Sequence, residues 1–329
     1  MRAVAFGCVA LLLCAPACSK QKSETAAAAP SGSLKPAAPL PAPVASGLPD
    51  PELVSSFVNP NKEKPYAGPT GTVRGRVVAK GDAAIDLPQI LAKIPATCPD
   101  AKSTYGKLFR EGPDRSLPDV LVAVTGYNGY VPEKEPAQRV EAKDCVFATR
   151  TLALTFGQRI DVVSGDKDTY IPELLGEHGQ PQIVATPHAG TASPLYPTHI
   201  GRFALIDDLK LFMTADVYVV KFATHAVTGM DGRFEITGVP VGAVHVNALL
   251  PATGATAYRE VSVTANKPTD EIVFELGFDA ADYAKRSAGA PPSASAAATA
   301  SASASATATG KGAPSAKAHP LPAPRPSAH

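Results

Sequence analysis

Residues 227–242, VTGMDGRFEITGVPVG, decide the fold of this chain. The segment holds the dipeptide Asp231-Gly232 and then the alternating apolar residues Phe234 and Ile236. Asp-Gly between two extended runs predicts a β-hairpin, because a type I′ turn needs a positive φ at both central positions. The segment therefore predicts an antiparallel β-domain. It carries no group arranged for catalysis.

Similar strand patterns recur through the middle of the chain. Runs rich in β-branched residues and alternating in polarity cover 72–79, 119–125, 145–155, 159–164, 202–206, 216–222, 233–237, 243–250, 258–264 and 271–276. Gly157-Gln158 resembles a second hairpin turn. A single helix is predicted at 85–93, with Asp86 as its cap and Leu87-Pro88 at its start. Such spacing is typical of an all-β fold built from sandwiches.

The two ends of the chain differ from this core. Of 329 residues, about the first 65 and the last 45 are rich in Ala, Pro and Ser and poor in large apolar side chains. Such segments cannot bury enough surface to offset the entropy of ordering the backbone. We therefore expect a disordered tether at 18–67, a folded core at 68–278 and a disordered low-complexity tail at 279–329.

The N-terminus has the pattern of an export signal over residues 1–17. Arg2 precedes a short apolar run, and Ala15-Pro16-Ala17-Cys18 follows it. This resembles a bacterial lipoprotein signal, although Ala15 stands where that family prefers Leu. The resemblance implies acylation of Cys18, and Ser19 after it implies the outer membrane, on its periplasmic or surface face. The alternative is ordinary secretion, since Ala15-x-Ala17 also suits simple cleavage.

The cysteines agree with export. Of the five, Cys8 and Cys14 lie in the signal and Cys18 is the expected lipid site, which leaves Cys98 and Cys145. An even pair in an exported protein predicts a disulfide. The alternative is a pair of metal ligands, but neither cysteine has a second Cys or a His at ligand spacing beside it.

Two sequence patterns resemble known β-folds. GTVRGRV at 71–77 and DGRFEI at 231–236 with VPVG at 239–242 resemble the carboxypeptidase regulatory-like (transthyretin-like) β-sandwich. The region between resembles cupredoxin-like proteins in DVLV at 119–122, CVF at 145–147, FGQR at 156–159, MTA at 213–215 and AVT at 226–228. The resemblance implies a cupredoxin-like region at 68–222 and a closing part at 223–278 that includes the strand at 71–79.

The copper ligands of that family do not carry over. Its members place a His after a strand that ends in Asn-Ser-Asp, whereas SGD at 164–166 here is followed by Thr169-Tyr170. Their Cys-x-x-His-x-x-Met run corresponds to Asp207, Lys210 and Met213. A blue-copper site needs two imidazoles and a thiolate. We therefore expect no copper and no other cofactor, with Met213 as a core side chain.

Segment 166–201 is too long for an ordinary loop. One hypothesis is a rebuilt metal site from His178, His188 and His199, with Glu173 or Glu177. Their spacing matches no ligand motif, so the alternative is three exposed histidines. His225 and His245 lie in strand-rich regions, where we expect half-buried, hydrogen-bonded rings.

Three functional classes remain. The first is a non-catalytic envelope lipoprotein, with a β-sandwich that binds or scaffolds other envelope proteins or polysaccharide. The second is a carbohydrate-binding module in which Tyr127, Tyr130 and Tyr196 stack on sugars, although the chain has no Trp. The third is a copper or redox protein. A net charge of +1 gives no basic surface for nucleic acid, and no catalytic set is recognisable, so we expect no enzyme.

Overall fold

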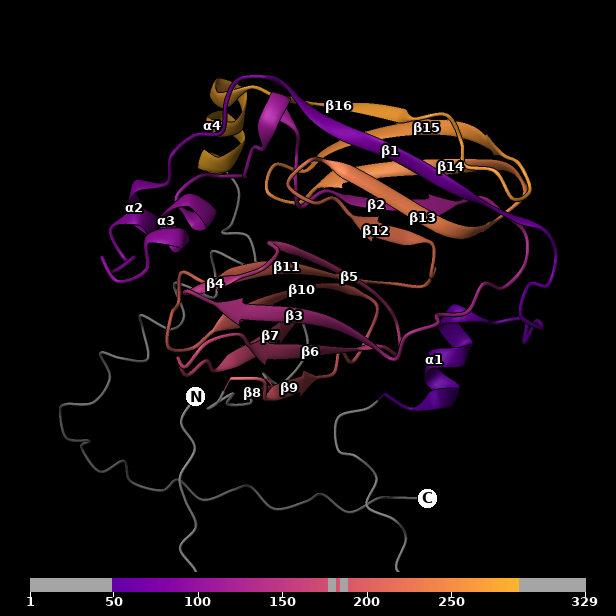
Figure 1. Ribbon diagram of the computed structural model, residues 1–329, viewed down its shortest axis with the longest axis horizontal. Helices are drawn as coiled ribbons and strands as arrows, with labels where there is room; N and C mark the ends of the chain where they lie inside the picture. Colours follow the sequence, from indigo (N-terminus) through magenta and orange to yellow (C-terminus); the bar gives the residue numbers. More distant parts are fainter. Residues whose placement is uncertain (1–48, 177–181, 184–188, 290–329) are drawn as a thin grey trace, which may run out of the picture. The chain divides into compact units, whose positions relative to one another are not determined.

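The computed structural model describes residues 49–176, 182–183 and 189–289 (Figure 1). The predicted signal, Cys18, most of the predicted tether and the tail from residue 290 lie outside the described residues. Strands grouped into four sheets dominate the described part. Two separate hydrophobic cores divide these sheets into two sandwiches. The predicted all-β sandwich fold is therefore confirmed.

The first sandwich, here called sandwich A, contains both ends of the folded core. One sheet has the order β13 (Arg233–Pro240), β1 (Thr70–Gly81), β16 (Ile272–Phe278). The other has the order β12 (His225–Val227), β2 (Leu121–Thr125), β14 (Gly242–Leu250), β15 (Ala255–Val263). Because side chains alternate between the two faces of a strand, Val73, Phe234 and Val244 point into the core that the two sheets share.

The second sandwich, sandwich B, is formed by the strands between β2 and β12. One sheet has the order β5 (Thr151–Thr155), β11 (Thr214–Val220), β10 (Gly201–Asp207), β7 (Pro172–Gly176), β8 (Gln182–Ile183). The other has the order β4 (Val146–Phe147), β3 (Ala137–Lys143), β6 (Arg159–Ser164), β9 (Ala192–Leu195). Leu154, Ile160 and Leu205 are fully buried between these sheets.

Sandwich B is thus an insertion in sandwich A. This corrects the assignment of 119–122 and 226–228 to the cupredoxin-like region. Residues 121–125 form β2, which pairs with β14 in the register Ala123↔Asn247, and β12 pairs with β2. Both strands therefore belong to sandwich A. The partners of β2 lie about 100 residues further along the chain, where local sequence patterns give no signal.

The predicted hairpin at Asp231-Gly232 is wrong. The strands on either side, β12 and β13, lie in different sheets. Of the two turn residues, only Gly232 has a positive φ, at 71°. Its N–H donates to the Gly229 carbonyl at 2.8 Å, and a Cβ here would lie 2.5 Å from the Val77 carbonyl oxygen. Because Gly232 has no Cβ, the chain can pass close to the Val77 carbonyl where it crosses from one sheet to the other.

The predicted hairpin at Gly157-Gln158 is wrong for the same reason, since β5 and β6 belong to different sheets. The predicted strand 145–155 is divided into β4 and β5. A two-residue turn with positive φ at both central positions does occur, at Asp144 (51°) and Cys145 (63°), between β3 and β4. Asp is among the residues that tolerate a positive φ, but Cys is not, so the local sequence does not indicate this turn.

Segments expected to be irregular contain regular structure. Helix α1 (Pro51–Val58) lies in the predicted tether, and Val54 and Val58 pack against the core of sandwich B. Helix α4 (Ala280–Gly289) lies in the predicted tail. Strands β7 and β9 lie in the predicted long loop. Strands β7 and β9 form because they bury side chains in sandwich B. Helix α1 forms because the Pro-rich stretch contains apolar residues that pack on the same core.

The remaining helices are short. Helix α2 (Pro88–Leu91) is shorter than predicted, and Leu87 rather than Asp86 occupies its N-cap. Helix α3 (Pro99–Tyr105) and the 3₁₀ turn η1 (Pro113–Arg115) complete the set. Within the described ranges, no helix is long and apolar enough to cross a membrane.

Candidate functional site

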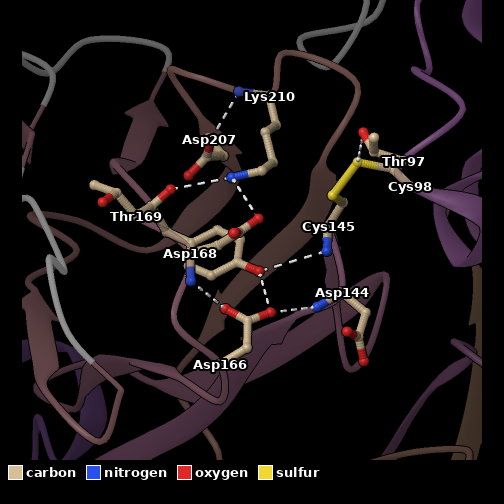
Figure 2. Close-up of a disulfide and its surroundings, with 10 residues drawn as sticks. Thr97, Cys98, Asp144, Cys145, Asp166, Asp168, Thr169, Asp207 and Lys210 are labelled. Atoms are coloured by element: carbon tan, nitrogen blue, oxygen red, sulfur yellow. Dashed lines mark hydrogen bonds and ion pairs between the residues drawn. A yellow bond between two sulfur atoms is a disulfide. The ribbon is translucent and has the colours of Figure 1, made fainter.

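A disulfide marks one end of sandwich B. Cys98, directly before α3, is bonded to Cys145 in the turn between β3 and β4, across 47 residues of sequence. Figure 2 shows the bond beside two further loops, which follow β6 and β10. We call these three loops, with the segment that leads into α3, the loop end of sandwich B. In the cupredoxin resemblance, this end contains the metal ligands.

Asp166 connects the first two loops. One carboxylate oxygen accepts hydrogen bonds from the Asp144 N–H at 2.7 Å and from the Tyr170 hydroxyl at 2.8 Å. The other accepts from the Asp168 N–H at 2.9 Å. Burial opposes ionisation of Asp166, but these bonds prevail and lower its pKa. The carboxylate therefore holds the strained turn and the β6 loop together.

Lys210 connects the second and third loops. Its Nζ donates to the Thr169 carbonyl at 3.0 Å and lies 3.7 Å from Asp168 Oδ2. It also stands 4.2 Å from the centre of the Tyr170 ring, a cation–π contact. The side chain is only 16% exposed. The ammonium is therefore fixed in place by three kinds of contact.

Asp207 organises the third loop from inside. Its fully buried carboxylate accepts from the N–H groups of Ile171 at 2.7 Å, Lys210 at 2.8 Å and Leu209 at 3.1 Å. Burial raises the pKa of Asp207, although the bonds counteract it. Asp207 thus acts as the hydrogen-bond acceptor around which the loop turns.

These residues do not fit a copper ion. Lys210 places a positive charge where the resemblance requires an imidazole, and the carboxylate of Asp207 is occupied by three backbone donors. Cys145 is oxidised and offers no thiolate. Met213 is fully buried, as expected for a core side chain. Among the residues of this end that the structure describes, the donor set of a blue-copper site is therefore missing.

A cavity of about 690 Å³ opens at the loop end. It is lined by the disulfide together with Lys93, Pro95, Thr97, Asp168, Leu209, Lys210, Leu211 and Phe212. Leu209 is 56% exposed although it is apolar. The walls hold a mixture of apolar and charged groups, but no nucleophile paired with a base. A cavity with such walls can accommodate a ligand or a side chain of a partner.

A carboxyl pair lies beside the third loop. Glu173 of β7 is 7% exposed, and it shares a hydrogen bond with Asp208. Burial, followed by the nearby Asp208, raises the pKa of Glu173 to about 7. Glu173 is therefore partly protonated at neutral pH. From the sequence, Glu173 was expected only as an additional ligand of a metal site built from histidines.

The candidate site residues from the sequence are scattered. The Tyr127 hydroxyl bonds Thr224 Oγ1 at 2.9 Å, and its ring meets Phe222 edge-on. The Tyr130 carbonyl accepts from Tyr66 at 2.7 Å, whereas Tyr196 follows β9 in sandwich B. These contacts do not form one stacking platform.

The predicted histidine cluster cannot be assembled from the described residues. His178 and His188 lie outside them, and the ring of His199 packs 4.6 Å from that of Phe203. Among the residues that the structure describes, no three His, Cys, Asp or Glu side chains are grouped for a metal ion. His225, near Glu133, and His245 are both hydrogen-bonded within the strand-rich regions, as expected.

Sequence reasoning missed a polar face on sandwich A. Tyr258 is 57% exposed on β15, and its hydroxyl lies 2.6 Å from His245 Nδ1 on β14. Asn247 lies directly opposite Tyr258 in the sheet. Alternation along 243–250 and 258–264 could have placed these side chains on one face, but the pairing of the strands was needed to bring them together.

Similarity to known proteins is limited. Neither described protein families nor curated proteins give a match. Amicyanin from Paracoccus versutus (Thiobacillus versutus) is 13% identical over 25% of this chain and 80% of its own, with a TM-score of 0.23. A copper-containing nitrite reductase (NirK) from Thermus scotoductus SA-01 is 16% identical over 29% of this chain and 24% of its own, with a TM-score of 0.22. These likenesses concern the fold alone.

Proposed function

We propose that this chain is an exported, lipid-anchored binding protein of the cell envelope, without catalytic activity. The observation that carries this proposal is the closure of the loop end, where Lys210 is held against Tyr170 and Asp168. Among the described residues of this end, these contacts leave no side chain free to act as a nucleophile or a base. The loop end presents a fixed surface and a cavity of about 690 Å³ instead.

The rigidity of this end favours recognition. The disulfide, Asp166 and Asp207 fix the loops before any partner arrives, so little conformational entropy is lost on binding. Leu209 provides an exposed apolar side chain at the rim of the cavity. A partner protein of the envelope that inserts a side chain beside Leu209 would suit this surface.

Export and anchoring rest on the sequence. The signal-like segment before Cys18 supports them, and the disulfide fits an oxidising compartment. Acylation is tested by labelling cells with an alkyne fatty acid. We expect label on the wild-type protein and none on Cys18→Ala. A labelled variant, or unlabelled wild type, contradicts the anchor.

The binding role is tested by placing a photo-crosslinking amino acid at Leu209 in the full chain. In intact envelopes we expect one dominant crosslinked product, which disappears when Lys210→Ala disturbs the loop. A crosslinker at Leu53, also exposed but on α1, is the matched control. Equal products from both positions, or none from Leu209, contradict recognition at the loop end.

A carbohydrate-binding role is the second candidate, and the exposed ring of Tyr258 favours it. A copper or redox role has no such support, because Lys210 and the disulfide replace its ligands. Metal analysis of protein purified from the periplasm tests this point. Stoichiometric copper would contradict our interpretation of Asp207 and Lys210.

A further inference from the structure

We infer that the outer face of β14 and β15 binds a neutral polysaccharide. Figure 1 shows the two strands side by side in sandwich A. This inference rests on the second candidate of the proposed function and deepens it, because it names the surface and the class of glycan; that surface is not the loop end. The inference follows from the arrangement of one exposed aromatic ring and the polar groups around it.

The strand register gathers these side chains on one face. Asn247 is opposite Tyr258, and His245 lies between Glu260 and Thr125. Alternate residues of a strand point to the same side, so these five share the outer face. The intervening residues Val244, Val246 and Ala248 are buried in the core of sandwich A. The outer face is thus polar on three strands at the level of His245, whereas Ala123 and Leu249 are apolar residues further along the same face.

Tyr258 is exposed but held in place. Its hydroxyl lies 2.6 Å from His245 Nδ1, and the two ring centres are 5.4 Å apart. His245 in turn packs on Gly126, where a Cβ would come within 2.5 Å of the imidazole. The ring is therefore oriented before a ligand arrives, which reduces the entropy lost on binding.

The chemistry of the face favours a sugar. The electron-rich face of a tyrosine attracts the C–H groups of a pyranose. Asn247 Nδ2 makes one long bond, 3.5 Å, to Thr125 Oγ1, and Glu260 is exposed, so amide and carboxylate are placed to bond hydroxyl groups. The five residues include no Lys or Arg, which disfavours phosphate or nucleic acid. They form no continuous apolar core of the kind that protein partners cover.

The test is affinity electrophoresis of the full chain in native gels that contain soluble starch, barley β-glucan, galactomannan or glycol chitin. We expect at least one polymer to retard the wild-type protein. Tyr258→Ala and Asn247→Ala should each weaken that interaction about tenfold or more, as expected when a stacking ring or a hydrogen bond in a site is lost. Tyr258→Phe keeps the ring and should retain most of the binding. Leu53→Ala, exposed on α1, is the matched control and should migrate as wild type.

Two results would overturn the inference. One is the absence of retardation in all four polymers. The other is equal retardation of wild type and Tyr258→Ala. The proposed function has a separate readout, because crosslinking at Leu209 should persist in Tyr258→Ala. Loss of glycan binding alone therefore leaves the loop end in place as a protein-binding surface, and loss of crosslinking alone leaves the glycan surface in place.

Discussion

Lys210 and Asp207 show how single side chains can fix the conformation of a loop. Asp207 accepts three backbone hydrogen bonds, and Lys210 supplies a positive charge that neighbouring oxygens and the Tyr170 ring stabilise. The sequence predicted that Lys210 disfavours a metal and that Met213 lies in the core. It could not predict the contact of Lys210 with Tyr170, because the two residues are 40 positions apart and no local pattern links them.

Glu173 should make the stability of the protein depend on pH. Its pKa is about 7 in the folded state instead of 4.5, so the bound proton stabilises the fold fully below about pH 4.5. That stabilisation is lost as the pH rises through 7. Glu173→Gln is neutral at every pH, and it should therefore exceed wild type in stability at pH 8 by on the order of 1–3 kcal/mol.

The measurement is urea unfolding of both proteins between pH 4.5 and 8, compared as a difference at each pH. Asp208→Asn, which removes the neighbouring charge, should also reduce the pH dependence. A difference between Glu173→Gln and wild type that stays constant across this range would contradict the raised pKa of Glu173.

Among the elements, strands were more predictable than turns. The strand predicted at 159–164 coincides with β6 (Arg159–Ser164), because side-chain alternation is a local property. The turns were misjudged, since Asp231-Gly232 joins two sheets, whereas the turn between the paired strands β3 and β4 has two positive φ values, at Asp144 and Cys145. Its conformation is maintained by the disulfide and by Asp166 from another loop, which the local sequence does not reveal.

Removal of the disulfide should therefore destabilise the turn between β3 and β4 more than the rest of the protein. The Cys98→Ser, Cys145→Ser double variant loses a crosslink across 47 residues, which should cost about 4 kcal/mol of unfolding free energy. Amide exchange should increase first at Asp144 and in the loop after β6. The control is wild type treated with dithiothreitol, which should show the same loss. Unchanged exchange at the turn would argue that Asp166 alone maintains it.

At the scale of the whole molecule, a buried ion pair connects the two sandwiches. Asp119, directly before β2, accepts from Arg110 Nη2 at 2.6 Å and Nε at 2.7 Å. The same carboxylate accepts from the Arg150 N–H at 2.8 Å and from Thr149 Oγ1 at 3.1 Å, both near the start of β5 in sandwich B. One side chain thus bonds to residues that lead into both sandwiches.

Asp119→Ala should consequently destabilise the protein by about 3–5 kcal/mol, because Arg110 would be left buried without its partner. We expect calorimetry to show two separated unfolding transitions in place of a single one. Asp119→Asn, which keeps the shape and some hydrogen bonds, should lose less. A single transition with a loss below about 1 kcal/mol would mean that the contact contributes little to the coupling of the sandwiches.

The insertion of one sandwich in the other was beyond the reach of the sequence. The family resemblance grouped 71–79 with the closing strands, and β1 pairs with β13 and β16. By contrast, 119–122 was assigned to the inserted region because it lies next to it in sequence. Only long-range pairing of β2 with β14 distinguishes these possibilities.

The pairing of β1 with β16 has a mechanical consequence. The two strands are parallel neighbours, in register from Gly75↔Ile272 to Gly81↔Phe278. A tension applied between the two ends of the folded core would pull these strands lengthwise past each other. Their hydrogen bonds would then bear the load together rather than opening one by one, so a protein held at both ends would yield only at high force.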